Sequence, residues 1–145
     1  MNDLLELYRE MNNHYIIYEL FSLNDSDSIS VMDDYGDCYI CIDPKRIHNI
    51  AQEKARLAHE VGHCMTGSFY NRYSQLNDIK QKEHRADVWA AKKIIPYEKL
   101  EIAFQNGIVE VWELAEYFNV TEDFILKTLQ VYEEKGLYHR PVCEE

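Results

Sequence analysis

Two histidines four residues apart, with a glutamate directly after the first, stand in the stretch ARLAHEVGHCMTG, residues 55–67. On an α-helix, residues i and i+4 share a face, so His59 and His63 lie one turn apart and both imidazoles can bind one zinc ion. Glu60 is turned by about 100° from His59, which places its carboxylate beside the ion and off the ligand axis. A carboxylate in that place is suited to act as general base for a water that zinc activates. The spacing therefore predicts a zinc centre with hydrolytic chemistry.

A second pair of side chains supplies the remaining ligand of such a centre. A catalytic zinc site has three protein ligands and an open fourth position. Glu83 and Asp87, in the stretch KEHRADVWAA, are four residues apart and share one face of a predicted helix. We expect Glu83 to complete a site of two histidines and one glutamate. Asp87 is expected to accept the free N–H of a zinc-bound imidazole, that of His59, and to fix its tautomer.

Two alternatives remain for this pair. Glu83 and Asp87 can form a solvated acidic face, which is common on surface helices. Against this, Ala86 and Ala90 flank the face and indicate close packing on another helix, where unpaired carboxylates would be costly. His84 is a competing third ligand, but it is rotated by about 100° from Glu83 around the helix.

Each motif lies on a helix with recognisable ends. Asn49, followed by Gln52 three residues later, resembles a capping box, and Gly67 is suited to cap the C-terminus of the same helix. The second motif lies on a helix predicted over residues 78–95, which Pro96 stops. Two facing helices of this kind form the expected zinc-binding core.

The segments before these helices have the character of a small sheet. Residues 15–20, 28–32 and 38–42 are short, rich in Ile, Val and Tyr, and separated by turn signals, so they are predicted to be antiparallel strands. A first amphipathic helix ends near residues 12–13. We therefore expect an α+β fold in which residues 1–96 form one domain, made of a helix, a small sheet and the two helices of the zinc centre.

Residues 97–145 are predicted to be an all-helical subdomain that packs on the metal core. Within it, WELAEYFNVTEDFILKTL resembles a helix-turn-helix, with these expected core positions: Leu114, Ala115, Phe118, Val120 and Ile125. Taken alone, the segment suggests a DNA-binding regulator. However, residues 97–145 contain 11 acidic and 4 basic residues, a net charge of −7, which would repel a phosphate backbone.

Composition limits the protein to one compact unit with no membrane span. The chain has 145 residues, of which 46% are hydrophobic, and its apolar runs are too short to cross a bilayer. Its N-terminus lacks the features of a secretion signal, so we expect a cytoplasmic protein. The net charge of −11 argues against direct nucleic-acid binding and favours a basic protein partner.

The four cysteines are predicted to be reduced thiols. They show no dense spacing framework, which fits a reducing cytosol better than a disulfide scaffold. Cys38 and Cys41 have the spacing of half a structural zinc site, but residues three apart in a strand point to opposite faces. Buried thiols are therefore the preferred interpretation of this pair.

The two motifs together resemble the ImmA/IrrE family of metallopeptidases. Members of that family have HExxH and then, downstream, ExxA followed by Asn or Asp and a segment that ends in a proline. LAHEVGHC and EHRADVWAAKKIIP match this pattern, and with GDCYICID the match covers most of residues 36–96. The resemblance implies a thermolysin-like core, peptidase activity and one zinc ion per chain. It implies that His59, His63 and Glu83 are the zinc ligands. It also implies that Glu60 is the catalytic carboxylate and that Asp87 lies behind the ligands.

The resemblance also implies a kind of substrate. The best-known family members cleave helix-turn-helix repressors of mobile genetic elements or of stress responses, so a basic repressor is the expected substrate. In thermolysin-like peptidases the substrate lies extended along an edge strand beside the zinc helix, and Cys38–Ile42 is the candidate strand. Tyr70 is the candidate for stabilising the oxyanion, on its proximity to the motif alone and not on the resemblance. The alternative is a non-enzymatic interaction protein with a structural zinc, which would have no need of Glu60.

Overall fold

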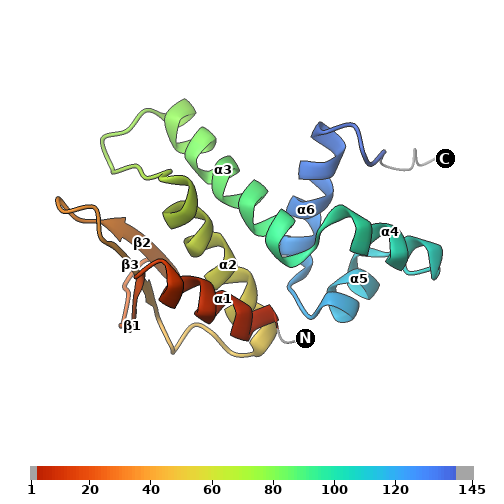
Figure 1. The fold of residues 1–145 in the computed structure, drawn as a ribbon, viewed down its shortest axis with the longest axis horizontal. Helices are drawn as coiled ribbons and strands as arrows, with labels where there is room; N and C mark the ends of the chain where they lie inside the picture. Colours follow the sequence, from red (N-terminus) through yellow and green to blue (C-terminus); the bar gives the residue numbers. More distant parts are fainter. Residues whose placement is uncertain (1–2, 140–145) are drawn as a thin grey trace.

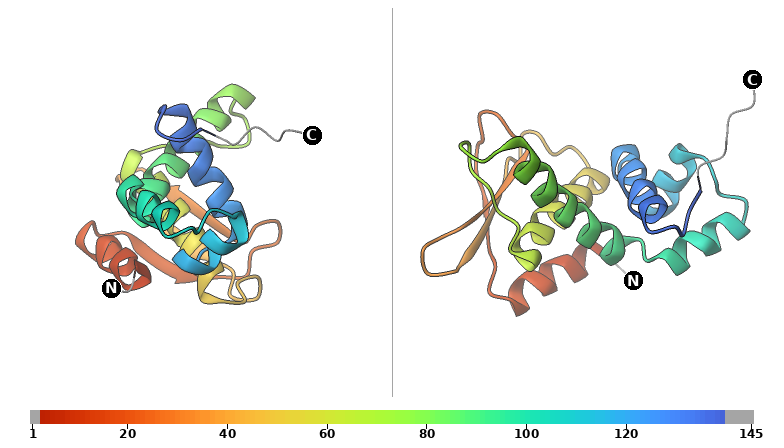
Figure 2. Two further views of the ribbon diagram at one scale, coloured as in Figure 1. Left: turned by 90° about the vertical axis from the view of Figure 1, so that its right-hand side faces the viewer. Right: turned by 90° about the horizontal axis from the view of Figure 1, so that it is seen from above.

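The computed structural model describes residues 3–139, and these form an α+β fold, as predicted (Figure 1). The sheet and the last three helices lie at opposite ends of the long central helices α2 and α3, which is also seen from above in the right-hand view of Figure 2. The elements, in chain order, are α1 (Asp3–Asn13), β1 (Ile17–Leu20), β2 (Ser28–Met32), β3 (Cys38–Ile42), α2 (Ile50–Thr66), α3 (Leu76–Ile94), α4 (Tyr97–Gln105), α5 (Val111–Phe118) and α6 (Glu122–Glu134).

The sheet is mixed, which corrects the prediction of a wholly antiparallel sheet. Its strand order is β1-β3-β2, with β2 antiparallel and β1 parallel to β3. The tight turn after β2, where Gly36 has φ +83°, makes β2 and β3 a hairpin. The longer connection after β1 leaves room for β3 to enter between β1 and β2. Strand propensity marks the segments, but it does not reveal which of them become neighbours.

β3 is the central strand, so the prediction that Cys38–Ile42 is the edge strand for a substrate is wrong. Cys38, Ile40 and Ile42 are buried in alternation, and both edges of the strand are paired within the sheet. β2 is the edge strand that packs against α2. A peptide that adds to this sheet beside α2 must therefore pair with β2.

The ends of α2 follow the predicted caps with one difference. The side chain of Asn49 accepts a hydrogen bond from the Gln52 N–H at 2.9 Å, and Gly67 closes the helix with φ +63°. The Gln52 side chain accepts from the His48 N–H at 2.8 Å, outside the expected capping box. α2 therefore begins and ends where local sequence predicts.

α2 and α3 approach each other to backbone contact. A methyl group on Gly62 would lie 2.6 Å from the carbonyl oxygen of Ala86, well inside van der Waals contact. Ala90, one turn further along α3, is also fully buried. The close packing inferred from the alanines of α3 is confirmed, and it brings the acidic face of α3 against the histidine face of α2.

The last three helices contain the helix-turn-helix-like pair. Asn119, in the left-handed conformation, ends α5, and the Thr121 side chain caps α6 by accepting from the Phe124 N–H. All five predicted core positions of this pair are buried. Two buried hydrogen bonds of 2.6 Å join these helices to the rest, from Tyr132 Oη to the Ile95 carbonyl and from Lys54 Nζ to the Phe118 carbonyl. A boundary at residues 96–97 stays a prediction.

None of the helices that the structure describes is both long and apolar enough to cross a bilayer.

Candidate metal centre

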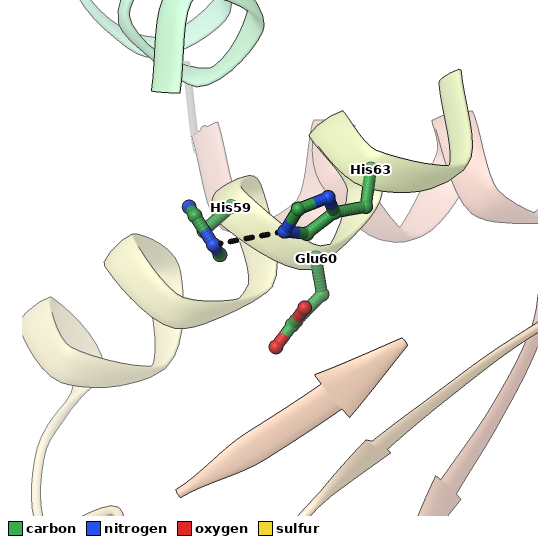
Figure 3. Close-up of side chains that lie close together, drawn as sticks. All are labelled: His59, Glu60 and His63. Carbon is green, nitrogen blue, oxygen red and sulfur yellow. Dashed lines mark hydrogen bonds between the residues drawn. The ribbon is translucent and has the colours of Figure 1, made fainter. Parts of the chain in front are cut away.

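α2 brings two imidazoles and a carboxylate together on the side that faces α3 and β2. The Nε2 atoms of His59 and His63 lie 3.1 Å apart, and Figure 3 shows the two rings turned toward each other. Glu60 points away from the rings toward the sheet (Figure 3). His63 and Glu60 are 4% and 5% exposed, and ionisable side chains are rarely so deeply buried unless they are paired. The helical spacing of the motif thus produces the predicted cluster.

The other nitrogen of each ring is fixed by an acceptor. His63 Nδ1 donates to the Ser68 carbonyl oxygen at 2.5 Å, and His59 Nδ1 donates to Asp87 Oδ1 at 2.8 Å. Because the hydrogen of each ring is on Nδ1, the lone pairs of both Nε2 atoms are free and point into the space between the two rings. Two nitrogens 3.1 Å apart can both lie at the 2.0–2.1 Å that zinc requires. The site therefore fits a cation between the rings.

Glu83 reaches the same point from α3. Its Oε2 lies 2.8 Å from His59 Nε2, and its Oε1 lies 3.1 Å from His63 Nε2. His84, the competing third ligand, points elsewhere and pairs with Glu134 on α6 at 3.1 Å. The structure thus gathers the donor atoms of His59, His63 and Glu83, together with Asp87 behind His59.

Two carboxylates lie within reach of a metal between the rings, and their contacts differ. The ligand atoms of His59, Glu60 and His63 all lie within 4.8 Å of one another, so Glu60 also belongs to a group that can hold a metal. Glu83 contacts both Nε2 atoms, whereas the Glu60 carboxylate accepts a hydrogen bond from Ser30 Oγ of β2 at 3.0 Å. The contacts favour Glu83 as the ligand and leave Glu60 beside it.

Electrostatics favour a positive centre at this point. Burial disfavours the charged imidazolium, but the hydrogen bonds to Asp87 and Glu83 outweigh it and raise the pKa of His59 to about 9. Burial also disfavours the Glu83 carboxylate, yet hydrogen bonds from His59, His63 and Tyr70 hold its pKa well below the usual range. The same carboxylates that favour a proton on His59 also favour a metal cation at this point.

An open cavity of about 390 Å³ leads to the cluster. Ser28, Ser30 and Val31 of β2 form one wall, with the two histidines, Glu60 and Glu83 opposite them. Tyr70 lines the cavity, and its hydroxyl donates to Glu83 Oε1 at 2.6 Å. Burial and the Glu83 carboxylate raise the pKa of this tyrosine above its usual value. A peptide can therefore approach the cluster along β2.

The cysteines of this region correct one prediction. Cys38 on β3 and Cys64 on α2 form a disulfide, with their Cα atoms 6.0 Å apart. The prediction of reduced thiols is wrong for these two residues, because the central position of β3 places Cys38 beside the last turn of α2. Cys41 is a free thiol, and Cys143 lies outside the described residues.

Comparison with known families agrees with the site. Residues 10–130, most of the chain, match the family model Peptidase_M78, the IrrE N-terminal-like domain. The chain therefore belongs to this family of metallopeptidases, and its resemblance to the ImmA/IrrE family is confirmed. No curated protein matches the chain at a significant level. Family and site together support a peptidase that acts on protein and holds a metal at the His59–Glu60–His63 group.

Proposed function

We propose that the protein is a zinc-dependent endopeptidase with one zinc per chain. His59, His63 and Glu83 hold the ion, and Glu60 is the general base. The observation that supports this assignment is the contact of Glu83 with both Nε2 atoms while Glu60 remains beside the donor set. A structural zinc site is closed by four protein ligands and uses no additional carboxylate.

The residues of the proposed site have two kinds of role: some orient the metal ligands, and Glu60 transfers a proton. A bound zinc ion supplies Lewis acidity, which polarises a peptide carbonyl and lowers the pKa of water. Glu60 accepts a proton from the attacking water and passes it to the leaving amine. Asp87 and the Ser68 carbonyl keep both imidazoles turned to the metal. The Tyr70 hydroxyl is the candidate donor to the oxyanion.

The substrate binds along β2 in this proposal. β2 is an edge strand, and it forms one wall of the cavity that contains the cluster. An extended peptide can add to its free edge with main-chain hydrogen bonds, which places a peptide carbonyl near the metal. A folded helix has no free main-chain groups for this pairing. The cut therefore falls in an exposed, extended segment of the substrate.

A basic helix-turn-helix repressor is the proposed substrate, and the cytoplasm the proposed location. The net charge of −11 favours a basic partner and disfavours direct contact with nucleic acid. The two alternatives predict different results. A non-enzymatic interaction protein binds the repressor without cutting it, and a DNA-binding regulator binds duplex DNA through α5 and α6.

Glu60→Gln tests the catalytic assignment. The substitution keeps the size and hydrogen-bonding ability of the side chain but removes the proton acceptor. The variant is expected to bind zinc and the repressor like the wild type, while cleavage falls by roughly 100-fold or more. Fragments are followed on a gel with a basic helix-turn-helix repressor as substrate, and a repressor gene found beside this gene would supply the first one to test. Glu101→Gln, on the exposed side of α4, is the matched control and should cut normally.

Each result separates the candidates. Equal fragmentation by wild type and Glu60→Gln would assign the base to another residue. Tight binding without fragments from either would support the interaction protein. Loss of zinc from Glu60→Gln would make Glu60 a ligand, and the roles of the two carboxylates would then be exchanged.

A further inference from the structure

The Cys38–Cys64 disulfide is adjacent in sequence to the candidate metal centre. Cys64 follows His63 directly on α2, and Cys38 is the first residue of β3. The bridge therefore ties the last turn of α2, which carries a candidate metal ligand, to the central strand of the sheet. Nothing in the proposed chemistry of peptide cleavage uses these two sulfur atoms.

This disulfide is open to an external thiol. Both cysteines line a surface cavity of about 380 Å³, together with His14, Met65 and the 85%-exposed Tyr15. The volume falls within the range of sites that take small molecules. Cys38 is buried, with 7% exposure, whereas Cys64 is half-buried. An attacking thiolate therefore reaches the sulfur of Cys64 more readily than that of Cys38.

Cys41 is a natural contrast within the same strand. It lies on the opposite face of β3, remains a free thiol, and is absent from the cavity lining. Burial, with the nearby negative charges of Glu19 and Glu60, raises the pKa of its thiol, which lowers its reactivity. Among the described cysteines, only the paired ones combine access with a position beside a candidate ligand.

We propose that Cys38 and Cys64 form a reversible thiol–disulfide exchange site for a low-molecular-weight thiol of the glutathione class. The oxidised pair holds His63 in position for the metal, so the redox state of the pair sets metal affinity. In the cytoplasm, disulfides of ordinary proteins are transient and serve catalysis or redox sensing. The effect on affinity rests on the metal centre proposed above, whereas the exchange itself does not.

The exchange consists of two thiol–disulfide displacements. A glutathione thiolate attacks Cys64 Sγ, the Cys38–Cys64 bond breaks, and Cys38 leaves as a thiolate that takes up a proton. A second glutathione thiolate attacks the glutathione sulfur of the mixed disulfide, which releases Cys64 as a thiolate that takes up a proton. Two glutathione thiols become one glutathione disulfide, and the protein gains two electrons and two protons. Glutathione disulfide reverses both steps.

Reduction releases one restraint on His63 and leaves another. The hydrogen bond from His63 Nδ1 to the Ser68 carbonyl remains, but the turn that carries both residues is no longer tied to β3. Loss of groups that orient a ligand from behind lowers metal affinity by about 10-fold to 100-fold. Because the hydrogen bond remains, the lower end, about 10-fold, is expected here.

Labelling in glutathione buffers tests the exchange. The metal-free full-length chain is equilibrated with defined ratios of glutathione to glutathione disulfide, quenched in acid, and labelled with a maleimide for peptide mass analysis. Labels should appear together on Cys38 and Cys64 as the buffer becomes more reducing, and should disappear when it is reversed. Cys41→Ser should behave in the same way. A bridge that resists reduction until the protein is unfolded would overturn the proposal.

Zinc competition with a chromophoric chelator tests the coupling. The Kd for zinc should be about 10-fold higher for the reduced wild type than for the oxidised wild type. The double variant Cys38→Ala/Cys64→Ala should match the reduced form, which excludes zinc binding by the freed thiols. Equal Kd values for the oxidised and reduced forms would overturn the coupling. The labelling readout needs no metal, so a failed metal centre is distinguished from a failed exchange site.

Discussion

Two pairs of helices in this molecule meet by different means. α2 and α3 meet at backbone distance through Gly62 and Ala86, and polar side chains fill the space beside that contact. α5 and α6 are held by buried apolar residues such as Leu114 and Phe124. Among their buried polar groups, Thr128 Oγ1 donates to the Phe124 carbonyl of its own helix, and Tyr132 Oη donates to the Ile95 carbonyl outside the pair. The first pair is arranged for chemistry and the second for packing.

The difference has an energetic cause. A metal centre must keep imidazoles and carboxylates close together in a partly buried place, which is unfavourable unless each is paired. The α2–α3 pair meets this requirement with a partner for each ring nitrogen of His59 and His63. The α5–α6 pair has no such requirement, so apolar burial stabilises it. Substitutions in the first pair should therefore change metal binding, whereas those in the second should change stability alone.

Removing a ligand is the largest expected effect. His63→Ala and Glu83→Ala should each weaken zinc binding on the order of 100-fold, because each removes one of the three protein ligands of the proposed site. His84→Ala is the matched control, since His84 is adjacent to Glu83 but pairs with Glu134 on α6. Zinc content and chelator competition measure the effect. Full zinc retention by Glu83→Ala would transfer the third ligand to another residue, with Glu60 the first to test.

The second effect concerns the residue behind His59. Asp87→Ala removes the acceptor of His59 Nδ1–H and should weaken zinc binding by about 10-fold to 100-fold. Asp87→Asn keeps an acceptor oxygen without the charge and should weaken binding less. Competition titrations of both variants measure this order. If the two variants lose the same affinity, the acceptor oxygen of the introduced asparagine has no effect, and Asp87 contributes through its charge and not by orienting the ring.

Gly62→Ala tests the backbone contact between α2 and α3. In an exposed helix this substitution adds about 1 kcal/mol of stability. Here the added methyl would meet the Ala86 carbonyl at 2.6 Å, so the free energy of unfolding should fall by about 1–3 kcal/mol. Chemical denaturation of the metal-free protein measures it. A rise in the free energy of unfolding would contradict this prediction, because it would mean that α2 and α3 can move apart without loss of stability.

Local sequence was sufficient for much of this arrangement. The four-residue spacings of His59 and His63 and of Glu83 and Asp87 predict their shared faces, because helix geometry is local. The bounds of β2 and β3 and the cap at Gly67 also match their predictions. Each of these features depends on residues within a few positions of one another.

Contacts between distant segments could not be predicted in the same way. Ser30 reaches Glu60 across 30 residues, and Cys38 meets Cys64 across 26. Both contacts depend on the strand order, which places β3 in the centre and β2 at the edge beside α2. A serine in a short strand carries no local sign of a role beside a metal. Ser68, by contrast, directly follows the Gly67 cap, so a carbonyl near the end of α2 was a foreseeable acceptor.

The smallest effect should come from the helix pair that is arranged for packing. The Thr121 side chain caps α6 by accepting from the Phe124 N–H at 3.1 Å, and Thr121→Ala leaves that donor without its partner. Loss of such a cap lowers stability by about 1 kcal/mol. Chemical denaturation should show this loss, while zinc affinity stays at the wild-type value. Thr121→Ser keeps the hydroxyl and should restore most of the stability. Weaker zinc binding by Thr121→Ala would show that the α5–α6 pair supports the metal centre, and the contrast between the two helix pairs would then fail.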